Sequence, residues 1–235
     1  NLDVALASDP LPDTGIGIGH TRWATHGGPT DANAHPHVSA NGRVALVHNG
    51  IIENFLELRA ELIAHGHSFA TQTDTEVVAH LVSAGLKRGV PPREAAAAAI
   101  RRLHGAFALA ILFEGHEELL VVARKGCPLA IGYGENEMFV GSDALALAPL
   151  TERIQYLEEG DIAFLDRRGA AVIDAAGEPA HGAQRVGGVA AGHEILGLNL
   201  VASGAGRAVE AEVSEARRPR AAGADGGEVV LGGAS

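Results

Sequence analysis

Three separated groups of polar residues have the chemistry needed to hold an amino acid and to stabilise an anion. The guanidinium of Arg22 can pair through two N–H groups with a carboxylate, and Asp74, at a predicted helix start, offers an anion for an ammonium group. Asn49 and Gly50 follow a predicted strand, where a side-chain amide and a backbone N–H can donate to one oxygen, as an oxyanion hole requires. Taken one at a time, such residues are more often an ion pair, a helix cap and a hairpin turn.

Two other patterns suggest different chemistry. The run from Gly15 to Gly19 alternates glycine with isoleucine, but it lacks the G-x-G-x-x-G spacing of dinucleotide loops and follows no buried strand, so it favours close packing in or beside a strand. His35 and His37 would share one face of an extended segment, a spacing compatible with a metal site. No cysteine accompanies these histidines and no carboxylate has a recognised ligand spacing, so a hydrogen-bonding scaffold without metal is favoured. The histidines in question are His20, His26, His35, His37 and His48.

The elements that would position these residues can be inferred from periodicity. Two strands, 15–21 and 43–48, flank a loop rich in Gly, Pro and Asn. Apolar residues at helical spacing predict a helix over 52–62, and a capping box from Thr73 to Glu76 predicts a second helix that runs to about Lys87. Pro91-Pro92 opens a third helix over 93–103, and residues 2–7 resemble the end of a short helix.

From Gly105 the pattern changes to short strands separated by turns. Glu114-Gly115 and Arg168-Gly169 are hairpin signals. A strand, then helices, then a strand meander predicts an α+β fold with helices packed on largely antiparallel sheets. The predicted strands are 106–113, 119–124, 129–133, 138–141, 162–165 and 170–173.

Composition excludes several classes of partner. The chain has 235 residues and a formal net charge of -11, so it has no overall positive field for nucleic acid or anionic lipid. A single cysteine, Cys127, excludes an internal disulfide framework and fits a reducing compartment. No run is long and apolar enough to span a bilayer and no signal peptide is evident, so we expect a cytoplasmic protein that acts on small molecules.

The order and spacing of four motifs resemble one enzyme family. The motifs are His20 to Gly27, Asn33 to His37, His48 to Asn54, and Thr73 to Glu76. Together they resemble the glutaminase domains of glucosamine-6-phosphate synthases, the isomerising glutamine–fructose-6-phosphate aminotransferases, which are class II glutamine amidotransferases. The resemblance extends over about residues 1–180, and Trp23 favours this group over amidophosphoribosyltransferases and asparagine synthetases.

The resemblance implies a role for each matching residue. Arg22 would bind the carboxylate of glutamine, Asp74 its ammonium, and Thr25 and His26 would line the same pocket. Asn49 and Gly50 would form the oxyanion hole, and Trp23 would gate the route of ammonia to the sugar site. The implied fold is the αββα four-layer sandwich of N-terminal-nucleophile hydrolases, here without its first strands, and no cofactor or metal is implied.

One position departs from the family. These enzymes use an N-terminal cysteine as nucleophile and its α-amine as base, whereas the first residue here is Asn1. Because the only methionine is Met138, we expect the sequence to begin inside a longer protein. Cys127, between Gly126 and Pro128, is predicted to be a structural, partly buried thiol. The 235 residues alone are therefore expected to release no ammonia from glutamine.

We expect two regions in the chain. Residues 1–180 would form the glutaminase domain without its N-terminal nucleophile block, and residues 181–235, which contain no aromatic residue, would be a low-complexity tail, disordered or frame-shifted. The partners implied are L-glutamine and two phosphosugar isomerase domains with a fructose 6-phosphate site, absent from this sequence, in a homodimer when intact. The alternatives are the glutaminase domain of another class II amidotransferase, or a non-catalytic glutamine-binding fragment.

Overall fold

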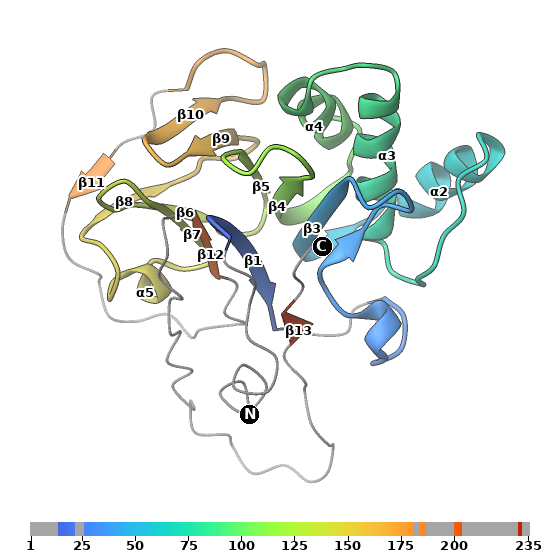
Figure 1. Ribbon diagram of the computed structural model, residues 1–235, viewed down its shortest axis with the longest axis horizontal. Coiled ribbons are helices and arrows are strands. Elements are labelled where there is room, and N and C mark those ends of the chain that lie inside the picture. The colour runs from blue at the N-terminus through green and yellow to red at the C-terminus, as the bar shows by residue number, and fades with distance from the viewer. Residues whose placement is uncertain (1–13, 22–25, 181–183, 187–199, 204–229, 232–235) are drawn as a thin grey trace, which may run out of the picture.

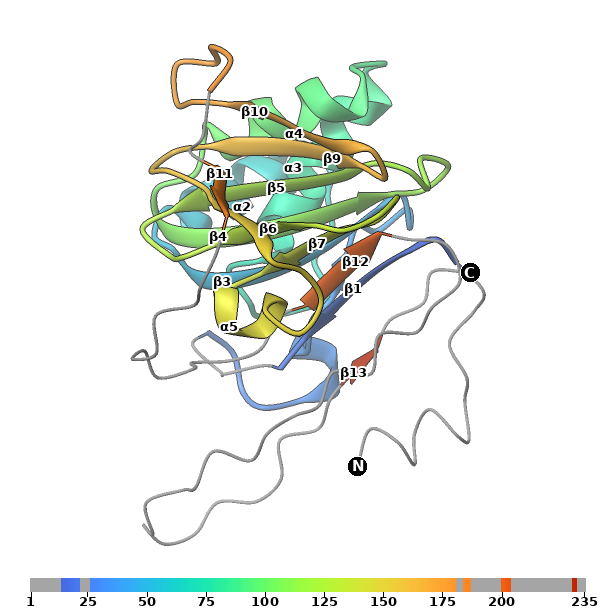
Figure 2. The ribbon, with the colours of Figure 1, turned by 90° about the vertical axis from the view of Figure 1, so that its left-hand side faces the viewer.

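The computed structural model describes residues 14–21, 26–180, 184–186, 200–203 and 230–231. The predicted helix over 2–7 and the predicted site residues Arg22, Trp23 and Thr25 lie outside the described residues. The described chain contains two antiparallel sheets that pack face to face, with helices on the outside (Figures 1 and 2).

The first sheet has six strands in the order β10-β9-β5-β4-β3-β2. Its central strands are long and apolar, and β3 pairs with β4 along its whole length, from Val44 opposite Phe113 to Ile52 opposite Gly105. The strands are β2 (His37–Val38), β3 (Val44–Ile52), β4 (Gly105–Phe113), β5 (Leu120–Lys125), β9 (Ile162–Asp166) and β10 (Gly169–Ile173).

The second sheet has seven strands in the order β11-β8-β6-β7-β12-β1-β13. The tail predicted after residue 180 contributes β11, β12 and β13, and β12 lies between β7 and β1. The strands are β1 (Ile16–His20), β6 (Ala130–Tyr133), β7 (Met138–Gly141), β8 (Arg153–Tyr156), β11 (Gln184–Val186), β12 (Leu200–Ser203) and β13 (Val230–Leu231).

Three buried clusters separate four layers. Helices α2 (Phe55–Ala64), α3 (Glu76–Lys87) and α4 (Pro92–Ile100) cover the outer face of the six-stranded sheet with one apolar cluster. A second cluster fills the space between the sheets, and a third lies under the four-residue helix α5 (Ala144–Leu147) on the seven-stranded sheet. The layers thus follow the predicted αββα order, with one short helix in the last layer of the described chain (Figure 1).

Two local predictions need correction. Asn49 and Gly50 do not follow the strand but lie inside β3, because they pair with Ala108 and Phe107 of β4. The predicted capping box does not form either. The carboxylate of Glu76 accepts hydrogen bonds from the N–H groups of Ala70 and Thr71 instead, and so holds the loop that precedes α3.

The remaining differences are short elements. A one-turn 3-10 helix (Asp31–Asn33), β2, β8 and α5 were not predicted, because segments of two to four residues contain too little periodicity.

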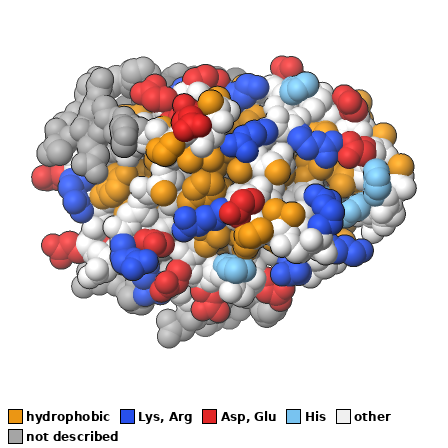
Figure 3. Space-filling model, turned by 90° about the horizontal axis from the view of Figure 1, so that it is seen from above, with side chains coloured by type: hydrophobic (Ala, Val, Ile, Leu, Met, Phe, Trp, Pro, Cys, Tyr) orange, Lys and Arg blue, Asp and Glu red, His pale blue; other side chains and the backbone are white. Residues whose placement is uncertain are grey.

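Acidic and basic side chains are interspersed over the face seen in Figure 3, with apolar side chains between them. Among the described residues, no helix has the length and apolar character needed to cross a membrane.

Candidate active site

Four buried histidines meet at the edge of the six-stranded sheet, and we call them the histidine cluster: His20, His35, His37 and His48. The His35 ring lies at the centre, with ring centroids 4.1 Å from His20 and 4.7 Å from His37. His20 ends β1, His37 starts β2 and His48 lies within β3. The cluster therefore joins both sheets at one place.

Hydrogen bonds determine where the protons of this cluster lie. The backbone N–H of His48 donates to Nδ1 of His35 over 3.2 Å, so the proton of the His35 ring is on Nε2. That Nε2 donates to Oγ1 of Thr75 over 3.4 Å. The Thr75 hydroxyl then donates to Nδ1 of His48 over 2.9 Å. The His48 ring is consequently a neutral tautomer with its proton on Nε2.

The environment of His48 keeps this ring uncharged. Burial lowers the pKa of His48 to about 4, although the carboxylate of Asp74 acts in the opposite direction. Neighbouring His20, His37 and His26 lower it further. At neutral pH the cluster therefore supplies no positive charge at His48.

This shift predicts a pH-dependent loss of stability. The unfolded chain binds a proton at His48 below about pH 6.5, whereas the folded chain binds it only below about pH 4. The stabilisation is thus complete above pH 6.5 and is lost as the pH falls through this window, by about 3 kcal/mol. Urea unfolding of the wild type between pH 4 and pH 7.5 measures this loss.

A matched pair of variants isolates the contribution of His48. His48→Asn keeps an acceptor for the Thr75 hydroxyl but cannot titrate, so its free energy of unfolding should vary less with pH. His116→Gln removes an exposed histidine and should retain the wild-type slope. Equal slopes for wild type and His48→Asn would contradict the assignment.

A second hydrogen-bonded chain runs from the cluster to a buried carboxylate. Nε2 of His37 lies 3.2 Å from Oγ1 of Thr73, and Thr73 Oγ1 lies 3.0 Å from Oγ1 of Thr71. The Thr71 hydroxyl donates to Oε2 of Glu76 over 2.7 Å, so Thr73 must donate to Thr71 and His37 must donate to Thr73. Burial would raise the pKa of Glu76, but the hydrogen bonds from Thr71 and Ala70 outweigh it and lower the pKa. All donors thus point toward one anion.

Asp74 lies between these two chains and is 2% exposed. Its Oδ2 accepts the backbone N–H of Ile52 over 2.8 Å. The nearest ring nitrogens are Nδ1 of His26, 3.8 Å from Oδ1, and Nδ1 of His48, 4.0 Å from Oδ2. No lysine or arginine among the described residues forms an ion pair with Asp74. Because a buried carboxylate needs a compensating cation, this geometry suits the ammonium group of a ligand.

His26 is the partly exposed residue beside Asp74. Its side chain is 31% exposed, and its ring contacts Phe55 edge-on with centroids 5.0 Å apart. The following loop is held by Asn33, which donates to the Gly28 carbonyl over 3.1 Å and accepts the Gln72 N–H over 3.0 Å. Asn33 therefore ties the loop that carries His26 to the loop that carries Asp74.

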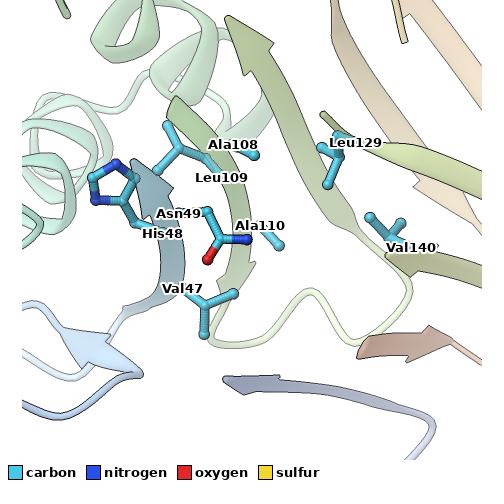
Figure 4. A pocket seen from close by; sticks show the side chains of 8 residues that line it. All are labelled: Val47, His48, Asn49, Ala108, Leu109, Ala110, Leu129 and Val140. Carbon is cyan, nitrogen blue, oxygen red and sulfur yellow. The ribbon is translucent and has the colours of Figure 1, made fainter. Parts of the chain in front are cut away.

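Asn49 lies on the opposite face of β3 from His48. Its side chain points into a small cavity between the two sheets, while the His48 ring is directed away toward the helices (Figure 4). Besides Asn49 and His48, the residues that line this cavity are apolar: Val47, Ala108, Leu109, Ala110, Leu129 and Val140. The Asn49 Oδ1 lies 3.0 Å from Nε2 of His20. The Asn49 amide is thus a polar side chain among mostly apolar neighbours.

Gly50 has a backbone conformation that other residues rarely adopt, with φ +109°. A Cβ at this position would lie 2.1 Å from the carbonyl oxygen of Ala106 and 2.9 Å from Sγ of Cys127. β3 and β4 can therefore pair at this point only with glycine.

Cys127 lies next to Gly50, but its thiol is not activated. Burial raises the pKa of Cys127, and the charge of Arg124 opposes this effect. A thiol with a raised pKa is mostly protonated at neutral pH and is a poor nucleophile. Its partial burial agrees with the structural role predicted from the sequence.

The structure brings together the predicted residues that it describes. Asn49 connects through His20, His35 and Thr75 to the neighbourhood of Asp74 and His26, so the separated motifs form one site. Arg22, Trp23 and Thr25 belong to the unplaced segment 22–25. Within the described residues, no group of three or more His, Cys, Asp or Glu side chains is arranged to hold a metal ion. The histidines bond instead to threonine, asparagine and backbone groups.

Thr75 and Asn33 were not singled out from the sequence. Each lies within a motif of the resemblance, yet hydroxyl and amide side chains in loops are too common to identify a connector. The signal that could have found them is their position next to His35 and Asp74 in the same motifs.

Comparison with known proteins shows which proteins this chain is similar to. A family model described as glutamine amidotransferase domain matches residues 20–149. A Brucella suis protein named glutamine–fructose-6-phosphate aminotransferase (isomerizing) is 60% identical over 179 residues, which cover 76% of this chain and 29% of the relative. A Zymomonas mobilis protein of the same name is 59% identical over 174 residues, 74% of this chain and 28% of the relative. The chain thus spans less than a third of these relatives.

Solved structures give the same fold. The glutamine phosphoribosylpyrophosphate amidotransferase of Bacillus subtilis matches with a TM-score of 0.53 and 28% identity, covering 66% of this chain and 33% of that protein. A structure described as the allosteric regulatory enzyme of purine biosynthesis matches with a TM-score of 0.54 and 30% identity, covering 66% and 34%. The α+β fold of the N-terminal-nucleophile hydrolase type is thereby confirmed. With the family model matching more than half of its length, the chain belongs to the glutamine amidotransferase domain family.

Proposed function

We propose that this chain is the glutamine-binding part of an isomerising glutamine–fructose-6-phosphate aminotransferase. In the whole protein, glutamine would be hydrolysed and its ammonia would convert fructose 6-phosphate to glucosamine 6-phosphate. The names of the similar proteins support this assignment. Another class II amidotransferase is less favoured, because the phosphoribosylpyrophosphate amidotransferase of Bacillus subtilis shares 28% identity with the chain, against 60% for the Brucella protein.

The buried carboxylate of Asp74 carries the proposal. It lies beside a neutral His48, and no lysine or arginine among the described residues forms an ion pair with it. The α-ammonium of glutamine would supply the missing charge. Arg22 would bind the α-carboxylate, Thr25 and His26 would line the pocket, and Trp23 would gate the release of ammonia, as the family resemblance implies.

The chemistry of the site follows from the position of Asn49 and Gly50. When a nucleophile attacks the side-chain amide carbon of glutamine, the carbonyl oxygen becomes an oxyanion. The amide of Asn49 and the N–H of Gly50 would donate to this oxygen. The oxyanion then re-forms the carbonyl as the C–N bond breaks, and the NH₂ group takes the proton lost by the nucleophile and leaves as ammonia. Water hydrolyses the acylated nucleophile and releases glutamate.

We infer that the 235 residues alone bind glutamine without releasing ammonia. The only cysteine of the sequence is Cys127, and burial raises the pKa of its thiol. The division into a glutaminase domain over 1–180 and a tail over 181–235, a cytoplasmic location, and a homodimer with isomerase domains belong to the same proposal.

Calorimetry on this chain tests the proposal. L-Glutamine should produce heat with a single binding site, whereas glutaramate, which lacks the ammonium group, should bind much more weakly because it leaves Asp74 uncompensated. An ammonia assay on the same sample should give no signal above buffer. Absence of heat with L-glutamine would contradict the binding function, and ammonia release would contradict the assignment of Cys127.

A further inference from the structure

His20 makes a polar contact between the two sheets. It is the last residue of β1 in the seven-stranded sheet and is 7% exposed. Its Nε2 lies 3.0 Å from Oδ1 of Asn49, which belongs to β3 of the six-stranded sheet. No role was assigned to this histidine in the proposed chemistry.

The chemistry of an amide fixes the direction of this bond. A carbonyl oxygen only accepts, so Nε2 of His20 must carry its proton and donate it to Asn49. The Asn49 oxygen is then occupied, and its NH₂ group, with two N–H donors, is the end left for a ligand. With the proton on Nε2, a flipped amide would bring its NH₂ group against this N–H, lose the bond from His20 and present its own oxygen to the oxygen of the substrate.

We propose that His20 is a positioning residue that fixes the amide orientation of Asn49, so that the NH₂ group faces the glutamine carbonyl oxygen. This inference rests on the proposed function of Asn49 as oxyanion donor. His20 would not touch the substrate. Its effect is to remove the cost of turning the amide when the oxyanion forms, which is the general requirement for electrostatic preorganisation.

The surroundings of His20 hold its ring in place for this task. The ring packs on His35 with centroids 4.1 Å apart and planes inclined by 33°. His35 is itself fixed by the His48 N–H at Nδ1 and by Thr75 at Nε2. The orientation of Asn49 is therefore connected to the same hydrogen bonds that surround Asp74. The proposed oxyanion donor and the proposed ammonium-binding carboxylate are thus held by one set of contacts.

Two variants and a buried control test this role. His20→Ala removes the donor, and His20→Gln restores one because its amide nitrogen can occupy the place of Nε2. His37→Gln changes another buried histidine of the cluster, which contacts Thr73. The Asn49 side-chain NH₂ signals and the ring nitrogen shifts of His20 are followed by ¹⁵N nuclear magnetic resonance on the full chain.

In the wild type we expect the proton on Nε2 of His20 and a single, slowly exchanging Asn49 NH₂ pair. These NH₂ signals should shift and exchange faster in His20→Ala, recover in His20→Gln, and stay near their wild-type positions in His37→Gln. Unchanged Asn49 signals in a folded His20→Ala variant, or a proton on Nδ1 of His20 alone in the wild type, would overturn the proposal.

Ligand titrations separate orientation from general damage. L-Norvaline has the α-ammonium and α-carboxylate of glutamine but no side-chain carbonyl. His20→Ala should weaken L-glutamine binding by about tenfold, the value of one lost hydrogen bond, and change L-norvaline binding by less than about twofold. An equal loss for both ligands would make His20 a merely structural residue. If the wild type binds no glutamine, the proposed function fails, while the Asn49 signals still decide whether His20 orients the amide.

Discussion

Replacement of Asp74 with asparagine should lower the affinity for L-glutamine by at least about 100-fold, which corresponds to the loss of one partner from a buried charge pair. Asparagine has nearly the same size, and its carbonyl can still accept the N–H of Ile52. The negative charge that would face the α-ammonium is removed. Calorimetry with L-glutamine on wild type and variant measures this difference.

The same substitution should not weaken the fold. In the free protein, the charge of Asp74 is buried beside a neutral His48, so its removal should leave the unfolding midpoint unchanged or raise it. Asp161→Asn is the matched control, because Asp161 is 3% exposed and also accepts one backbone N–H, from Glu158 over 2.8 Å. It should bind glutamine like the wild type. Affinity of Asp74→Asn within threefold of wild type would refute the ammonium site.

Gly50→Ala should have the largest effect on stability, a loss of about 3 kcal/mol or more, to the point of preventing folding. Its Cβ would lie 2.1 Å from a backbone carbonyl, and alanine would have to adopt φ +109°. Because Gly50 pairs with Phe107 in the middle of the site, the strand cannot move without displacing Asn49. Urea unfolding of the variant, or its recovery in the soluble fraction, measures the effect.

Two further variants separate the causes of this loss. Gly17→Ala also adds a methyl group to a strand. Apart from its chain neighbours, no described residue has an atom within 4 Å of the added Cβ, so stability should change by less than about 1 kcal/mol. Cys127→Ala in the Gly50→Ala background removes the thiol contact and leaves the carbonyl contact, so it should not restore stability. A stable Gly50→Ala protein with normal glutamine binding would contradict this account of β3.

Much of the fold could be predicted from the sequence, because its long elements have strong periodicity. The predicted helix starting at the Thr73 to Glu76 motif corresponds to α3, and the predicted strands 106–113 and 119–124 correspond to β4 and β5. The end of β3 was placed too early, since Asn49-Gly50 is typical of hairpin turns. Pairing with β4 overrides this local preference. The residues of one strand do not show which strand it will pair with.

The sequence names candidate site residues but not the contacts between them. Asn49, Gly50, His26 and Asp74 were identified from residue chemistry and resemblance. The histidine pattern favours a scaffold without metal, but spacing along the chain does not state which ring nitrogen faces which group. The bonds of His35 to the His48 N–H and to Thr75 come from residues 13 and 40 positions away. Such contacts form only when the sheet edge has folded, so the sequence around each histidine does not show them.

The chain of donors from His37 through Thr73 and Thr71 to Glu76 also constrains how this domain can change during evolution. Each hydroxyl accepts one hydrogen bond and donates another. Reversing the direction of one hydrogen bond therefore requires all the others to reverse. A glutamine at position 76 would place its NH₂ group against the backbone N–H of either Ala70 or Thr71, so the carboxylate of Glu76 fixes the acceptor end of this chain. The four positions should therefore show strong epistasis, with substitutions that are harmful alone and tolerated together.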